Sequence, residues 1–216
     1  DGTYGFKQPS GKVNVEVTFK ETVKVCPGDK TCPMYGYTDL DRSAWYHDGV
    51  HFCIENGLMN GVGKNEFQPH ATTSRAMIVT ILWRLEGKPS AGTAAFTDVA
   101  ANTWFAEPVA WASANGIVNG YGNGRFGADD IITREQLATI LYRYEQSKGG
   151  GFKGMWMFLL RFDDTAEISE WAYEPMCWMT MNSIMEGDEN NNINPKSGIT
   201  QAEMEEIFAR FNAVER

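Results

Sequence analysis

Residues 37–61 read YTDLDRSAWYHDGVHFCIENGLMNG, and residues 96–120 read FTDVAANTWFAEPVAWASANGIVNG. The two stretches superimpose without a gap at an offset of 59 residues. The segments that follow them, TSRAMIVTILWRL at 73–85 and TREQLATILYRY at 133–144, match at the same offset. Because a repeat at fixed spacing forms the same structural unit in each copy, this periodicity decides the fold.

A third, diverged copy follows at an offset of 67 residues from the second. The residues that it keeps from the second copy include Trp171, Ile184, Gly187, Thr200 and Arg210. It has Ser183 where the second copy has a glycine, and Gln201 where the second copy has an arginine. An insertion or linker, 149–161, precedes it. We therefore place the repeats at 37–89, 96–148 and 162–214.

Each copy reads as a helix, a loop and a second helix. In the first copy, apolar residues recur at helical spacing over 45–56, and Gly57 follows as a C-terminal cap. The second helix begins after the N-cap residue Ser74, whose counterparts are Thr133 and Thr200. One helical hairpin cannot bury its own apolar face. The sequence therefore predicts a mainly α fold in which three hairpins share one core.

The N-terminal segment has a different period. Apolar and polar residues alternate from Val13 to Phe19, which is typical of a β-strand. Tyr4 and Phe6 precede this run across a Pro-Ser-Gly turn signal. We therefore predict a short β-hairpin over 1–24, the remnant of a preceding β-module.

Residues 25–36 form a linker that contains Cys26 and Cys32 in the sequence CPGDKTC. A loop of this length can close a small disulfide ring, which is typical of oxidising, extracellular settings. We predict a disulfide between the two cysteines. Two free thiols are the alternative, because spacing alone does not establish pairing.

Three potential zinc ligands, His47, His51 and Glu55, are spaced to lie on one helical face. The sequence shows no evident fourth ligand and no second cysteine pair with the spacing of a zinc site. We therefore expect no metal and no cofactor, and we expect the histidines on the surface or lining a groove.

The composition and charge exclude several functions. The net charge is −9 and no basic run is present, whereas a nucleic-acid binder needs clustered Lys and Arg to displace counterions. No stretch approaches the roughly 20 apolar residues of a membrane span. No Ser/His/Asp or Cys/His arrangement lies on a recognisable scaffold, so we expect a chain that is not an enzyme.

The repeated strings resemble the S-layer homology (SLH) family. Residues 37–61 and 96–120 are similar to the opening half of an SLH repeat, and 73–85 and 133–144 are similar to its closing helix. The resemblance implies a pseudo-threefold, mainly helical unit whose inter-repeat grooves bind a secondary cell-wall polysaccharide. By the same resemblance, we expect this polymer to be acidic and to carry a pyruvyl ketal. The resemblance further implies non-covalent anchoring of an exported protein on the outside of a bacterial cell.

The resemblance also assigns sugar-binding roles to individual residues. They are Arg75 and Arg134, with Ser74, Thr133, Asp39, Asp98, Trp45, Trp104, Gly61 and Gly120 around them. An arginine in the first turn of a helix adds a bidentate clamp beside unpaired backbone N–H groups and the positive end of the helix dipole. Gln201 cannot supply this charge, so the number of working grooves, two or three, stays open.

Alternatives remain for these residues and for the chain as a whole. The arginines could form ion pairs with the aspartates, and the tryptophans could belong to the core. The second functional hypothesis is a surface adhesin or protein-interaction module on an SLH scaffold that has lost part of its wall binding. Its protein partner would contact the insertion 149–161, which contains an apolar run from Met155 to Leu160.

Overall fold

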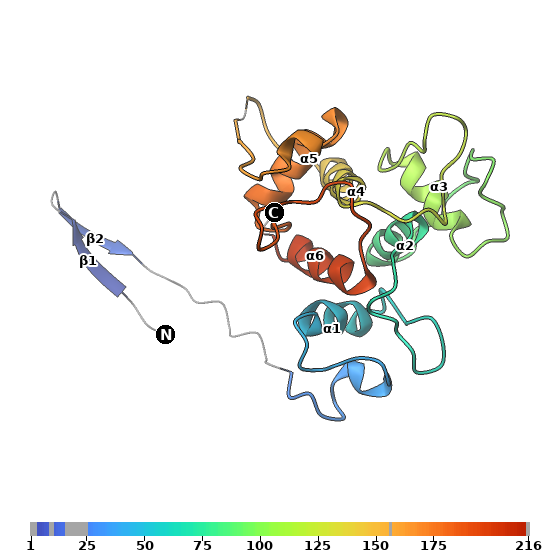
Figure 1. Cartoon of the computed structure of the whole chain (residues 1–216), viewed down its shortest axis with the longest axis horizontal. Coiled ribbons are helices and arrows are strands. Elements are labelled where there is room, and N and C mark those ends of the chain that lie inside the picture. The colour runs from blue at the N-terminus through green and yellow to red at the C-terminus, as the bar shows by residue number, and fades with distance from the viewer. Residues whose placement is uncertain (1–3, 9–10, 16–25, 156, 215–216) are drawn as a thin grey trace.

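The chain is mainly α-helical, as the periodicity predicts (Figure 1). The structure is a computed structural model that describes residues 4–8, 11–15, 26–155 and 157–214. Its α-helices are α1 (His47–Glu55), α2 (Arg75–Leu85), α3 (Ala106–Ala114), α4 (Arg134–Ser147), α5 (Glu170–Met181) and α6 (Gln201–Ala213). Two short 3-10 helices, η1 (Pro33–Gly36) and η2 (Thr165–Glu167), precede α1 and α5. None of the helices in the described ranges is long and apolar enough to cross a membrane.

The second helix of each repeat begins at the predicted N-cap. The side chains of Ser74, Thr133 and Thr200 each accept a hydrogen bond from the backbone N–H three residues further on, at 3.3–3.4 Å. At α6 the carboxylate of Glu203 also accepts a hydrogen bond from the backbone N–H of Thr200, at 2.9 Å. Reciprocal caps of this kind fix where the helix begins.

The first helix of each repeat ends at a residue with positive φ. Gly57 and Gly116 have φ values of 64° and 70°, which confirms glycine as the C-terminal cap. Ser183 has a φ of 55°, so the third repeat keeps the left-handed conformation without a glycine. In the first repeat, α1 begins at His47, two residues later than the expected helix over 45–56.

The helices pack mainly between repeats, and buried residues from all three repeats form one hydrophobic core, as the sequence predicts. Helix α2 packs on α3, α4 packs on α5, and α1 packs on α6 (Figure 1). Long connections join all of these helices, as in residues 56–74 between α1 and α2 and residues 86–105 between α2 and α3, so connection length does not decide which helices pack together. The contact between α1 and α6 joins the first repeat to the third.

Backbone hydrogen bonds also connect the three repeats in a closed ring. The N–H of Thr73 donates to the carbonyl of Ile199 at 2.8 Å, and the N–H of Ile199 donates to Ile132 at 3.2 Å. The N–H of Ile132 donates back to Thr73 at 3.0 Å. Each of these residues lies just before the N-cap of a second helix, so the ring brings the starts of α2, α4 and α6 together.

The first-turn N–H groups of the second helices are already used. The N–H of Arg75 donates to the carbonyl of Asp130 at 3.0 Å, and the N–H of Arg134 donates to Ser197 at 3.0 Å. The N–H of Gln201 donates to Ala71 at 2.8 Å. We expected these groups to be free for a ligand, and this was wrong. The loop of the neighbouring repeat satisfies them.

The N-terminal strands β1 (Tyr4–Gln8) and β2 (Gly11–Val15) pair antiparallel, with Tyr4 opposite Val15. Val17 and Phe19, which we placed in the same strand, lie outside the described residues. The origin of this segment as the remnant of a β-module stays a prediction.

The predicted Cys26–Cys32 disulfide is absent, and both cysteines are free thiols. The spacing brings the two thiols close together but does not decide their chemistry. The Sγ of Cys32 contacts Nε2 of His47, on α1, at 3.7 Å. The side chains that surround a thiol pair therefore matter as much as the length of the loop between them.

Candidate binding grooves

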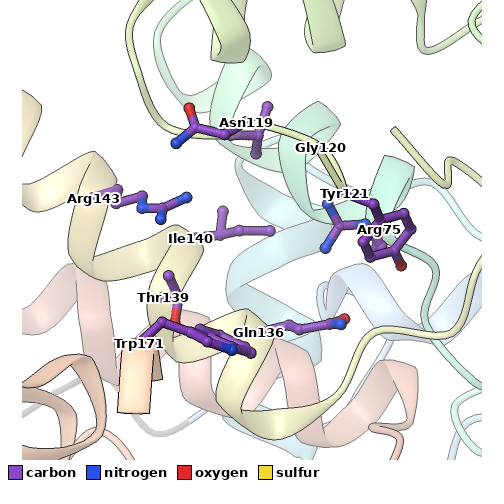
Figure 2. A pocket seen from close by; sticks show the side chains of 10 residues that line it. Arg75, Asn119, Gly120, Tyr121, Gln136, Thr139, Ile140, Arg143 and Trp171 are labelled. Carbon is purple, nitrogen blue, oxygen red and sulfur yellow. The ribbon is translucent and has the colours of Figure 1, made fainter. Parts of the chain in front are cut away.

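Three grooves occupy corresponding positions in the three repeats. The first, which we call the two-arginine groove, has a cavity volume of about 310 Å³ (Figure 2). Its lining residues are Arg75, Val118, Asn119, Gly120, Tyr121, Gln136, Thr139, Ile140, Arg143 and Trp171. They come from all three repeats, because α2 supplies Arg75, α4 supplies Arg143 and α5 supplies Trp171.

Arg75 is held firmly at the edge of this groove. Its side chain is buried, with only 6% of the residue exposed, and its Nε donates to the carbonyl of Phe126 at 3.0 Å. The guanidinium carbon lies 4.7 Å from the ring centroid of Tyr121 and 5.0 Å from that of Phe126. Burial lowers the pKa of Arg75, while Tyr121 and Asp130 act in the opposite direction. An arginine stays charged under these conditions, so the groove contains a fixed cation.

Arg143 brings a second cation to the same groove. Figure 2 shows Arg75 and Arg143 on opposite sides of the cavity, with Ile140 between them. Among the described residues, Arg143 has no hydrogen bond and no carboxylate within ion-pair distance. Burial lowers the pKa of Arg143, and its positive charge contributes to lowering the pKa of Arg75. Two guanidinium groups that lack a carboxylate partner are suited to an anionic ligand.

The remaining walls of the groove are suited to a sugar. Asn119 and Gln136 supply hydrogen-bonding groups and Ile140 supplies an apolar floor, whereas the hydroxyl of Thr139 already donates to the carbonyl of Glu135 at 2.8 Å. Trp171 is 52% exposed, which leaves a ring face open for the CH groups of a sugar ring. The groove therefore combines charge, hydrogen bonding and an aromatic surface.

The second groove, which we call the Arg84 groove, has a cavity volume of about 390 Å³ and contains Trp104 and Gly61. Nη1 of Arg84 donates to the carbonyl of Leu58 at 2.7 Å. By the repeat alignment, the counterpart of Arg75 here is Gln201. This groove therefore has one arginine, and that arginine already binds the backbone.

The third groove, which we call the acidic groove, has a cavity volume of about 480 Å³ and is lined by Arg134 together with Glu186, Asp188 and Glu203. Arg134 donates to the carbonyls of Ile193 and Glu186 at 2.8 and 2.9 Å. Burial lowers the pKa of Arg134, and the nearby carboxylates, led by Glu203, act against this effect. The charge of Arg134 is thus balanced by the protein itself.

Comparison with known sequences shows the family to which the repeats belong. The sequence model of the S-layer homology domain matches residues 36–76, 95–138 and 161–205, which together make up more than half of the chain. The chain belongs to the S-layer homology domain family.

Curated relatives of this SLH chain are much longer proteins. The surface-layer 125 kDa protein of Lysinibacillus sphaericus is 28% identical over 171 residues, which are 78% of this chain and 14% of that protein. The S-layer protein of Bacillus thuringiensis subsp. finitimus is 24% identical over 184 residues, 81% of this chain and 21% of that protein. The amylopullulanase of Thermoanaerobacterium thermosulfurigenes is 27% identical over 202 residues, 92% of this chain and 10% of that protein. The SLH chain thus spans about a tenth to a fifth of these relatives.

The family and its S-layer relatives establish the cellular setting. The SLH chain is a cell-surface, extracellular protein that is associated with the cell wall, and its task at this level is cell-wall anchoring.

The predicted site residues Asp39 and Asp98 accept hydrogen bonds from loop backbone. The carboxylate of Asp98 accepts hydrogen bonds from the backbone N–H groups of Phe126 and Gly127, both at 2.8 Å. Asp39 makes the corresponding contacts in the first repeat, at 2.7–3.0 Å. Burial alone would raise the pKa of Asp98, but these hydrogen bonds and Arg125 lower it. Among the described residues, neither aspartate forms an ion pair with Arg75 or Arg134.

Replacing Asp98 with alanine should lower the free energy of unfolding by about 2–4 kcal/mol, because two loop N–H groups lose a charged acceptor. Urea unfolding measures this loss. Asp129→Ala is the matched control, since Asp129 is an exposed carboxylate in the same loop. Equal midpoints for the two variants would show that Asp98 does not hold the loop.

Of the other predicted residues, some line a groove and others cap a helix. Trp45, Trp104 and Trp171 are 62%, 59% and 52% exposed, so the alternative that places them in the core was wrong. Trp104 lines the Arg84 groove, and Trp45 packs edge-on against Tyr46 at 5.5 Å. Ser74 and Thr133 act as helix caps and do not line a described groove.

Gly61 and Gly120 line the Arg84 groove and the two-arginine groove respectively. A Cβ atom at Gly120 would lie 2.5 Å from the carbonyl oxygen of Arg125, and φ at this position is 63°. The turn itself therefore requires glycine, whether or not a ligand is present.

Sequence reasoning missed Arg143 and its counterpart Arg84 as site residues. The available signal was an arginine at the same position of every repeat, Arg84, Arg143 and Arg210. The family resemblance indicates only the arginine in the first turn of the second helix, Arg75 or Arg134.

Proposed function

We propose that this chain anchors an exported protein by binding an acidic, pyruvylated secondary cell-wall polysaccharide in the two-arginine groove. The observation that carries the proposal is the pair of guanidinium groups, Arg75 and Arg143, that share one cavity. The ring of backbone hydrogen bonds and the three equivalent helix pairs support a pseudo-threefold arrangement, which would place one groove at each repeat.

The chemistry of the groove matches a carboxylate on a sugar. An arginine binds a carboxylate through two parallel N–H···O bonds, and a second arginine opposite can neutralise the same group. The net charge of −9 does not prevent this, because charges more than about 10 Å away are largely screened at physiological ionic strength. Trp171 and Asn119 would then contact the sugar that carries the acid.

We infer that the two-arginine groove is the main site of the three. Three carboxylates line the acidic groove, and an anion placed there would be repelled by them. The Arg84 groove has one arginine, with Gln201 at the position of the second. This inference narrows the earlier expectation of equivalent sites at Arg75 and Arg134.

Sedimentation of the chain with purified cell-wall sacculi tests the proposal. The chain should pellet with sacculi that retain the secondary polymer and should stay in the supernatant after the polymer has been stripped chemically. Pelleting that is unchanged by stripping would contradict polysaccharide binding.

A second candidate function is protein interaction through the insertion 149–161. The observation that favours it is the full exposure of Met155 and Met157, followed by the exposed Leu159. Adaptable methionine side chains are common at protein contacts. Binding to walls that survives removal of the polymer but is lost after protease treatment of the walls would favour this candidate.

A further inference from the structure

A second cluster of reactive side chains lies where the chain enters the first repeat. It consists of Cys26 and Cys32 from the CPGDKTC loop, together with His47 and His51, one turn apart on α1. We call it the thiol–imidazole cluster. The corresponding positions of His47 and His51 in the second repeat are alanines, so the cluster is particular to the first repeat.

Three side chains of the cluster lie close enough together to hold one metal ion, and the fourth, His47, contacts one of them. One sulfur from Cys26, one sulfur from Cys32 and one ring nitrogen from His51 all lie within 4.8 Å of one another. Nε2 of His47 lies 3.7 Å from the sulfur of Cys32. In a tetrahedral zinc site the metal–ligand distances are about 2.0–2.3 Å, which places neighbouring ligand atoms about 3.3–3.8 Å apart.

Each histidine also has a carboxylate on its other ring nitrogen. Nδ1 of His47 lies 2.8 Å from the carboxylate of Asp48, and Nδ1 of His51 lies 3.6 Å from the carboxylate of Glu55. A carboxylate at Nδ1 fixes the tautomer of a ligating histidine and leaves Nε2 free to bind the metal. His47 is therefore oriented in the way that metal ligands usually are, with Nδ1 at the carboxylate of Asp48 and Nε2 toward Cys32, whereas the 3.6 Å separation at His51 is longer than a hydrogen bond.

We propose that Cys26, Cys32, His47 and His51 form a Cys2His2 site for Zn²⁺. Four protein ligands leave no open position, so the site would be structural. From the sequence we expected no metal, because it shows no second cysteine pair with the spacing of a zinc site. In this proposal the two thiols and the two histidines together supply the four ligands.

The bound metal would link the CPGDKTC loop to helix α1 of the first repeat. The same hollow is lined by Glu206, Ala209 and Ala213 of α6, the helix on which α1 packs. A metal that joins the CPGDKTC loop to α1 would therefore stabilise the segment beside the contact between the first and third repeats. Wall binding in the two-arginine groove does not depend on it.

Titration of the reduced, full chain with Co²⁺ under anaerobic conditions tests the proposal. We expect one Co²⁺ per chain, with the visible absorption of tetrahedral cobalt, a thiolate-to-cobalt charge-transfer band, and displacement of both by Zn²⁺. The variants Cys26→Ser, Cys32→Ser and His51→Gln should each weaken zinc affinity by more than about 100-fold. Asp48→Asn should weaken it by about 10–100-fold, the usual cost of losing a carboxylate behind a ligating histidine.

His70→Gln and Cys177→Ala are matched controls, since neither residue belongs to the cluster, and both should bind zinc as the unmodified chain does. Cobalt binding without the charge-transfer band would overturn the proposal. So would ligand variants with unchanged affinity. A Cys26–Cys32 disulfide that persists, by mass spectrometry, in chain produced with zinc would also overturn it.

Discussion

Replacing Arg143 with glutamine should weaken the binding of a pyruvylated wall fragment by about 10–150-fold. The substitution removes one charge-assisted contact to the carboxylate, worth about 1.5–3 kcal/mol. Because Arg143 has no ion-pair partner among the described residues, its loss should leave the free energy of unfolding nearly unchanged. Calorimetric titration of each variant with the fragment measures the dissociation constant.

Arg84→Gln and Arg210→Gln are the matched controls for this experiment. Arg84 lines the Arg84 groove, and Arg210 is the third-repeat counterpart of Arg143 and forms an ion pair with Glu186, a residue of the acidic groove. If the two-arginine groove is the main site, both controls should bind nearly as tightly as the unmodified chain. If either control weakens fragment binding more than Arg143→Gln does, the fragment binds in another groove.

Replacing Glu205 with glutamine should stabilise the chain by about 2–4 kcal/mol at pH 8. Glu205 is fully buried on α6, and neither oxygen of its carboxylate has a hydrogen-bond partner among the described residues. Burial raises its pKa from 4.5 to about 9. The other repeats have Val79 and Ala138 at this position, so the third repeat places an acid where the core is otherwise apolar.

The sign of the pH dependence follows from the direction of this shift. Below about pH 4.5 Glu205 is protonated in both the folded and the unfolded chain. Between about pH 5 and 9 the folded chain retains a proton that the unfolded chain releases, so the stability falls as the pH rises. Above about pH 9 the contribution levels off at its most unfavourable value.

Urea unfolding at pH 5, 7 and 9 measures this trend. The Glu205→Gln variant should show a flatter pH dependence than the unmodified chain, whereas Glu189→Gln, in an exposed loop, should not change it. Parallel pH profiles for Glu205→Gln and the unmodified chain would mean that the carboxyl is solvated in the folded state.

The sequence was sufficient for the elements that depend on local chemistry. The fixed offset between repeats revealed the helices, and Ser74, Thr133 and Thr200 marked where the second helices begin. Gly57 marked a left-handed helix end correctly. These features depend on neighbours in the sequence, so a single sequence contains the information that determines them.

Features that depend on distant contacts could not be read in this way. The packing of α1 on α6 joins opposite ends of the module, and no local pattern indicates it. The role of Asp98 depends on the backbone of Phe126, 28 residues away. The pairing of Arg143 with Arg75 across one cavity likewise requires the arrangement of two repeats.

The cysteines show how a correct observation can still predict the wrong chemistry. The proximity of Cys26 and Cys32 was expected, and their atoms do lie close together. The sequence did not show that two histidines of α1 would lie beside them. Whether two nearby thiols pair or bind a metal depends on those further neighbours.

The most direct test is titration of the chain with a defined wall fragment in two forms, one with the pyruvyl ketal and one without it. If the carboxylate of the ketal lies between Arg75 and Arg143, the pyruvylated fragment should bind with a stoichiometry near one. The fragment without the ketal should bind at least about 10-fold more weakly. Equal affinity for the two forms would show that the paired guanidinium groups do not recognise an acidic sugar.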